Sequence, residues 1–141
     1  MAALTTNYDG ERKEGDLVAY RVLGATKIYK GALVAVVDAS GFLSKASDAA
    51  GLTFAGVALE GADNATGVSG DVGVRVEKTG TFILDFSGGA VTQTALGKKV
   101  YAVDDHTVGL AATTANDLYV GDVVALIAGG KVRVRIDRAA G

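Results

Sequence analysis

The stretch Lys131-Val-Arg-Val-Arg-Ile-Asp137 decides the fold class, because aliphatic and charged residues alternate strictly along it. Val132, Val134 and Ile136 fall on one face, and the charged side chains fall on the other. A period of two is the mark of a β-strand with one face buried and the other in water. The same pattern occurs earlier, in Val72-Gly-Val-Arg-Val-Glu77. The sequence therefore predicts a β-structure in which similar strands recur.

Glycine punctuates the rest of the chain in the way expected of many short strands. The 141 residues include 20 glycines and no proline, and the glycines fall between short apolar runs. Glycine supplies the positive-φ positions that tight turns and bulges require. We expect an all-β fold, a small single-domain β-barrel or sandwich. Its strands are predicted at Leu17 to Leu23, Leu33 to Val37, Phe42 to Ser44, Thr53 to Leu59, Val72 to Glu77, Thr81 to Phe86, Lys99 to Val103, Thr107 to Leu110, Leu118 to Leu126 and Lys131 to Ile136.

Two halves of the chain resemble one another, which suggests an internal duplication. Gly31-Ala-Leu-Val-Ala-Val-Val-Asp38 aligns with Gly97-Lys-Lys-Val-Tyr-Ala-Val-Asp104, at an offset of about 66 residues. Each is followed by a short second strand, a polar loop, a strand that contains glycine, and a closing Val-Arg-Val strand. The repeat predicts two similar β-units folded against each other. Helical signal is weak, with single turns conceivable at Asp48 to Leu52 and Val91 to Leu96.

The N-terminal residues lack apolar periodicity and are predicted to form an arm outside the folded body. Residues 1–16 are mostly polar, with Leu4 and Tyr8 as exceptions. We expect a flexible arm over 1–16 and a β-domain over 17–141. The arm is either an unstructured tail or a segment that becomes ordered when it joins the sheet edge of a partner.

Composition excludes several classes of protein. A hydrophobic fraction of 49% excludes a wholly disordered chain. No apolar run approaches the ~20 residues that span a bilayer. No basic start followed by a long apolar run resembles a signal peptide. We therefore expect synthesis in the cytoplasm and no membrane partner. The net charge of -2 and the absence of a basic stripe argue against direct contact with nucleic acid. The absence of cysteine excludes disulfides, thiolate catalysis and zinc–cysteine sites.

The polar residues offer little chemistry. His106, the only histidine, follows Asp104 and Asp105 in a turn, where a solvated loop is favoured over a metal site. Asp63-Asn64 is interpreted as a turn former. The glycine pairs lack the lysine of a phosphate-binding loop. The aromatic residues are expected to sit singly, without a stacking platform. We assign no catalytic, cofactor-binding or metal-binding residue, and we expect a protein that is not an enzyme and needs no cofactor.

The order of several short β-motifs resembles the head decoration, or capsid cement, proteins of tailed bacteriophages. The motifs are Phe54-Ala-Gly-Val-Ala-Leu-Glu60, the stretch from Gly70 to Phe82 with its Thr-Gly-Thr-Phe end, Leu96-Gly-Lys-Lys-Val-Tyr101, Tyr119-Val-Gly-Asp-Val-Val-Ala-Leu126 and Val132-Arg-Val-Arg-Ile136. The likeness covers roughly residues 33–137. It rests on β-motifs and not on a catalytic signature.

This resemblance implies a structural role. A member of the family would be a virion protein that binds the outer surface of the expanded capsid, with the major capsid protein as partner. It would associate with itself, as a homotrimer or, as the alternative, a dimer. The resemblance also implies that the arm reaches onto the capsid lattice. The capsid-contacting residues would then be Leu4, Thr5, Thr6, Asn7 and Tyr8.

A second hypothesis belongs to another class, a cell-surface or carbohydrate-binding β-module displayed on a virion. Such a module would expose a cluster of aromatic side chains and would bind glycans as an isolated domain.

The alternating strand supplies the first testable prediction. We expect Val134→Asp to prevent folding, because it places an unpaired charge on the inward face. The measurement is thermal unfolding of the purified variant. A soluble variant that melts cooperatively would show that the inward face has been assigned wrongly.

Overall fold

The fold is all-β, as the sequence predicts. The computed structural model describes residues 2–7, 12–87 and 90–140. Three short helices accompany the strands, and one of them, α1, lies at the C-terminal end. The elements are β1 (Leu17–Arg21), β2 (Thr26–Ile28), β3 (Leu33–Val37), β4 (Leu43–Lys45), β5 (Leu52–Ala58), β6 (Ala62–Asn64), β7 (Gly73–Glu77), β8 (Thr81–Phe86), η1 (Gln93–Ala95), β9 (Lys99–Ala102), β10 (Thr107–Gly109), η2 (Ala111–Thr113), β11 (Tyr119–Ile127), β12 (Lys131–Arg135) and α1 (Asp137–Ala140).

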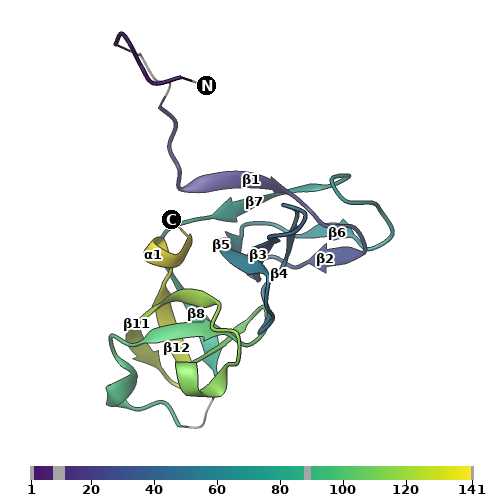
Figure 1. The fold of residues 1–141 in the computed structure, drawn as a ribbon. Helices are drawn as coiled ribbons and strands as arrows, with labels where there is room; N and C mark the ends of the chain where they lie inside the picture. The colour runs from purple at the N-terminus through teal and green to yellow at the C-terminus, as the bar shows by residue number, and fades with distance from the viewer. Residues whose placement is uncertain (1, 8–11, 88–89, 141) are drawn as a thin grey trace.

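The strands form two units, one above the other in Figure 1. The first unit is a five-stranded sheet in the order β1-β7-β5-β3-β4, with the β2–β6 ribbon beside it. The second unit is a closed barrel in the order β8-β12-β11-β9-β10, in which β10 returns to pair with β8 in parallel. The first sheet nearly closes in the same way, through a parallel bridge between Val22 and Leu43. Both units are therefore built to one plan.

The shared strand order confirms the repeat. β1, β7, β5, β3 and β4 correspond in turn to β8, β12, β11, β9 and β10, and each pair of neighbours has the same relative direction. Bulges also correspond, since the register shifts opposite Ala55 in β5 and opposite Val120 in β11. Val132, Val134 and Ile136 are fully buried, as the alternation predicts. The interior of each unit is thus lined by matching aliphatic positions.

The β2–β6 ribbon was not predicted. Asp63 and Asn64 lie in β6, which pairs with β2. The interpretation as a turn former is confirmed for Asp63, whose Oδ1 atom accepts from the amide of Ala65 at 3.0 Å, but the side chain of Asn64 has a different role. Asn64 is only 2% exposed, and its Nδ2 atom donates to the carbonyl oxygens of Val22, Leu23 and Val68 at 2.9–3.2 Å. A buried amide needs such partners, because an unsatisfied one costs about 1–3 kcal/mol. Asn64 therefore ties the ribbon to the end of β1.

The helices also differ in part from expectation. The predicted turn at 91–96 is present as η1, whereas the predicted turn at 48–52 is not helical. Neither η2 nor α1 was expected. Gly129 and Gly130 lie in the turn between β11 and β12, and both have positive φ, 88° and 75°.

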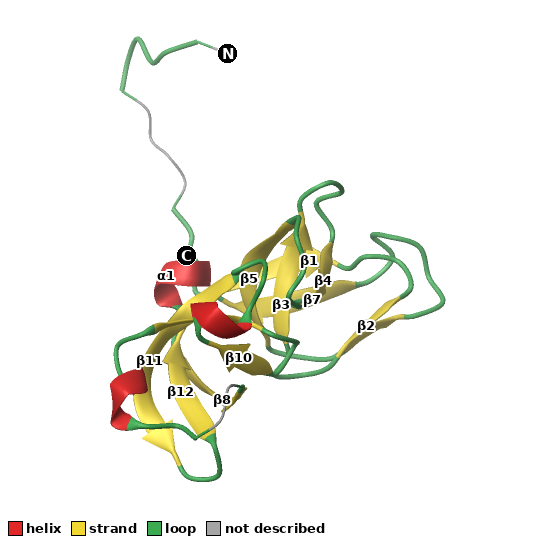
Figure 2. Ribbon diagram, turned by 60° about the horizontal axis from the view of Figure 1, so that its bottom comes forward, coloured by secondary structure: helices red, strands yellow, loops and turns green. Residues whose placement is uncertain are grey.

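The two units share one hydrophobic core across the contact between them, which we call the joint. Leu33, Ala35, Phe54 and Val57 lie on the outer face of β3 and β5, yet they are at most 5% exposed. They belong to the same buried cluster as the interior of the second barrel. The α1 helix packs against both β5 and β11, and Figure 2 shows it at the boundary of the two units.

Hydrogen bonds fix the position of the joint. The amide of Leu33 donates to the carbonyl of Asp105 at 2.7 Å. The carboxylate of Asp48 accepts from the amides of Ala115 and Asn116, and from the side chain of Asn116, at 2.9–3.2 Å. The backbone bond from Ala115 is the main cause of the lowered pKa of Asp48, followed by the bond from Asn116.

Glycine is required at corresponding positions of the two bulged strands. A Cβ on Gly56 would collide with the carbonyl oxygen of Glu77, and one on Gly121 would collide with that of Arg135. Each would also lie 2.8 Å from a valine Cγ1, that of Val76 or Val134. The close approach of β5 to β7, and of β11 to β12, therefore depends on the missing side chain.

We expect Gly121→Ala to lower the free energy of unfolding by about 1–3 kcal/mol, because the added methyl group meets backbone that cannot move without disturbing the barrel. Gly73→Ala is the matched control, since its Cβ would lie at an ordinary 3.6 Å from the nearest atom. Denaturant unfolding of the two variants measures the difference. Equal stabilities would contradict the close-packing argument.

The joint also predicts a response to acid. The pKa of Asp48 is lower in the folded protein than its ordinary 3.8. Its contribution to stability is therefore complete above that value and is lost as the pH falls through the folded pKa. Asp48→Asn should melt at a lower temperature than the wild type at pH 7, and the difference should shrink below about pH 4. The exposed Asp16→Asn serves as control, and a pH-independent difference would argue against the charge.

Candidate functional site

Residues 12–16 of the N-terminal arm run away from the body at the start of β1 (Figure 1). Its described residues are all exposed, and Leu4 is 74% exposed. Of the expected contact residues, Leu4, Thr5, Thr6 and Asn7 lie on this arm, and Tyr8 falls outside the described residues. Leu4 is thus an apolar side chain that no described part of its own chain covers.

The root of the arm is fixed to the body. The amide of Lys78 donates to the carbonyl of Asp16 at 2.8 Å, which marks the point where the arm joins the sheet. In both overall views the arm leaves close to α1. A segment of 16 residues can span up to about 50 Å when extended, at ~3.3 Å per residue. The arm can therefore reach surfaces well beyond the body of its own chain.

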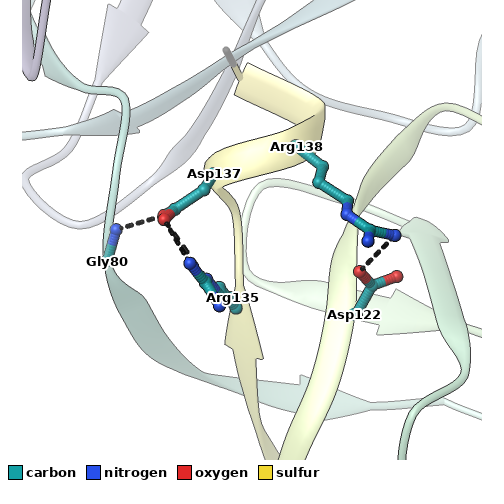
Figure 3. Close-up of polar contacts among 5 residues, drawn as sticks. All are labelled: Gly80, Asp122, Arg135, Asp137 and Arg138. Carbon is teal, nitrogen blue, oxygen red and sulfur yellow. Dashed lines mark hydrogen bonds and ion pairs between the residues drawn. The ribbon is translucent and has the colours of Figure 1, made fainter.

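A network of polar contacts holds α1 in place (Figure 3). The carboxylate of Asp137 accepts from the amide of Gly80 at 2.7 Å and from the guanidinium of Arg135 at 3.2 Å. The bond from Gly80 is the main cause of the lowered pKa of Asp137. Arg138 points the other way, to Asp122, with 3.8 Å between the charged atoms. The first turn of α1 is thus connected to β8 on one side and to β11 on the other.

A groove of about 450 Å³ lies beside this network. Its basic side chains outnumber its acidic ones by three to two. The lining residues are Gly97, Lys99, Asp122, Val123, Val124, Arg135, Asp137 and Arg138. Both carboxylates already accept hydrogen bonds, Asp122 from the Tyr119 hydroxyl at 2.9 Å and Asp137 as above. Carboxylates that are already hydrogen-bonded in this way suit a surface that recognises a partner by its shape and charge.

A tyrosine pair extends the groove along the outer face of the second barrel. The rings of Tyr101 and Tyr119 lie 6.1 Å apart with a 54° tilt, and the Lys99 ammonium lies 5.5 Å from the centre of the Tyr119 ring. Burial, followed by the bond to Asp122, raises the pKa of Tyr119. The expectation that the aromatic residues sit singly is therefore wrong for this pair. The rings meet because Tyr101 and Tyr119 are register partners of β9 and β11.

Sequence reasoning missed the tyrosine pair, although a signal was present. Aligning the halves places Tyr101 opposite Ala35 and Tyr119 opposite Phe54. Because Ala35 and Phe54 are register partners, the repeat predicts the tyrosine pair once the register of β3 and β5 is known. The groove gives no such signal, since its lining comes from three segments that are separate in the sequence.

The turn with His106 is a polar loop. The amide of His106 donates to Asp104 Oδ1 at 2.8 Å, and its ring lies 4.0 Å from the carboxylate of Asp85. Across residues 2–7, 12–87 and 90–140, no three histidine, aspartate or glutamate side chains gather as a metal would require. The helices of this part of the chain are too short or too polar to cross a membrane.

Comparison with known proteins adds no relative. No family model matches the chain, and neither the curated proteins nor the solved structures contain a significant match.

Proposed function

We propose that this chain is a structural virion protein, a decoration or cement protein that binds the outer surface of an expanded phage capsid and stabilises it. The observation that carries the proposal is the N-terminal arm, which is exposed along its described length and includes the exposed Leu4. The order of β-motifs, which resembles that of decoration proteins, supports it. The partners are the major capsid protein and further copies of this chain.

The stabilising effect would follow from selective binding. A ligand that binds one of two states shifts the equilibrium towards that state by its difference in affinity. A rigid two-unit body with a long arm can contact more than one capsid subunit. The expanded shell alone places those subunits at the matching separation. Association into a homotrimer would join three arms and raise the effective concentration of each at the shell.

The geometry of the tyrosine pair argues against the alternative function, a glycan-binding module. Sugar-binding platforms present an aromatic face to the ligand, whereas Lys99 already lies over the Tyr119 ring and the two rings are tilted. Glycan screening of the isolated protein distinguishes the two functions, since the decoration protein should bind no glycan.

Deletion of residues 1–14 tests the role of the arm. We expect the truncated protein to keep its melting temperature, because β1 begins at Leu17, and to bind expanded capsids at least tenfold more weakly. The measurement is co-sedimentation with expanded capsids that lack the protein, and unexpanded shells are the control.

The point variant Leu4→Ser separates apolar contact from arm length, with Thr6→Ser as its matched control. Loss of binding for Leu4→Ser alone would place the leucine in the contact. Undiminished binding of the deleted protein would remove the arm from the mechanism, and failure of the full-length chain to bind either shell would overturn the proposed function.

A further inference from the structure

The repeat makes the two units comparable position by position, and the comparison reveals an uncovered surface. In the first unit, the outer face of β3 and β5 is closed by the joint. The equivalent face of the second unit lies on β9 and β11, and we call it the β9–β11 face. It consists of Lys99, Tyr101, Ala111, Thr113, Tyr119 and Asp122, which correspond to Leu33, Ala35, Ala46, Asp48, Phe54 and Val57.

The exposure of these positions differs between the units. Leu33, Ala35 and Phe54 are at most 5% exposed because the second unit covers them. Lys99, Ala111 and Thr113 are exposed, and Tyr101 and Tyr119 are only half-buried. The same backbone framework therefore carries a covered face in one unit and an open face in the other.

The β9–β11 face nevertheless has the composition of a contact surface. Tyrosine and arginine are enriched at protein interfaces, and aliphatic side chains commonly complete their centres. Here the tyrosine pair lies next to Arg138, and Val124, which is 45% exposed, lines the groove. Its polar character suits a contact that forms after folding, because an open face as apolar as the joint would aggregate.

The joint indicates what could cover this face. Its covering elements include the turn at 103–106 and the loop at 115–117 of the second unit, which meet Leu33 and Asp48. Their counterparts in the first unit are the turn at 37–41 and the segment at 50–52. Residues 38–41, Ala50 and Gly51 are exposed, and the small side chains among them permit close approach.

The charges of the two surfaces also favour the turn and segment of the first unit as the covering elements. On the open face and its groove there are three basic side chains and two acidic ones, which leaves an excess of one positive charge. The basic residues are Lys99, Arg135 and Arg138, and the acidic residues are Asp122 and Asp137. Asp38 is the only charged residue in the turn at 37–41 and the segment at 50–52. The two surfaces are complementary in sign.

We propose that the β9–β11 face binds the first unit of a second copy of this chain, in a head-to-tail contact that repeats the joint. By the correspondence of the halves, Ala39 of the second copy would lie near Lys99, as Asp105 lies near Leu33 within the chain. Ala50 of the second copy would lie near Thr113, as Ala115 lies near Asp48. Such a contact is heterologous, so copies can close into a ring. It concerns contact between copies and does not depend on capsid binding.

Cross-linking between single-cysteine variants tests the contact, because the chain has no cysteine of its own. Lys99→Cys and Ala39→Cys are purified separately and treated with a short bis-maleimide, alone and mixed. We expect a cross-linked dimer in the mixture and none in either variant alone. Ala128→Cys, in the exposed β11–β12 turn, replaces Lys99→Cys as the control and should give no product with Ala39→Cys.

Sedimentation equilibrium gives an independent measurement. The wild type should associate, and Tyr101→Asp should weaken association at least tenfold, whereas the exposed Val68→Asp should not. Unchanged melting of Tyr101→Asp shows that the fold is retained. A monomeric wild type, a cross-link in Lys99→Cys alone, or association without the Lys99–Ala39 product would overturn the proposal. Capsid binding by a monomer would overturn this contact and the proposed self-association, and would leave the capsid-binding function standing.

Discussion

The burial of both faces of β3 and β5 is the constraint on which the rest of the structure depends. Val34 and Ala55 point into the first unit, while Leu33 and Phe54 point out of it, and all four are at most 5% exposed. A strand that is apolar on both faces needs a layer on each side. The first sheet supplies one layer, and the second barrel with α1 supplies the other. Each buried leucine, valine or phenylalanine contributes about 1.5–3 kcal/mol, so the two units stabilise each other.

Strand alternation and glycine spacing were enough to predict the fold class and most strands. The period-two pattern of β7 and β12 depends only on which face of each strand is buried. That burial is visible in a short stretch of sequence as alternation of apolar and polar residues. β2 and β6 leave no such trace, because each has three residues and their pairing is set by contacts far away in the chain. Asn64 is typical of a turn by composition, yet three backbone carbonyls hold it in a buried strand.

The candidate site could be predicted only where it depends on local sequence. The arm follows from the lack of periodicity in residues 1–16, and its described residues are exposed as that pattern implies. The groove and the tyrosine pair depend on strand register. Val120 forms a bulge in β11, and this bulge determines which side chains of β11 share a face with Tyr101. Hydrophobic alternation cannot locate a bulge, so the outer face of the second barrel could not be derived from periodicity alone.

Divergence between the halves is most informative where the backbone has stayed the same. Gly56 and Gly121 both permit the close approach of a neighbouring strand, so the geometry of the bulge is common to both units. On this shared backbone the side chains differ, because Tyr119 takes the position of Phe54 and Asp122 takes the position of Val57. The hydroxyl of Tyr119 and the carboxylate of Asp122 bond to each other, which keeps an aromatic ring at the surface without leaving its polar atom unpaired. A face meant only for solvent would have no need of ordered tyrosines, whereas a dissociable contact requires both solubility and aromatic surface.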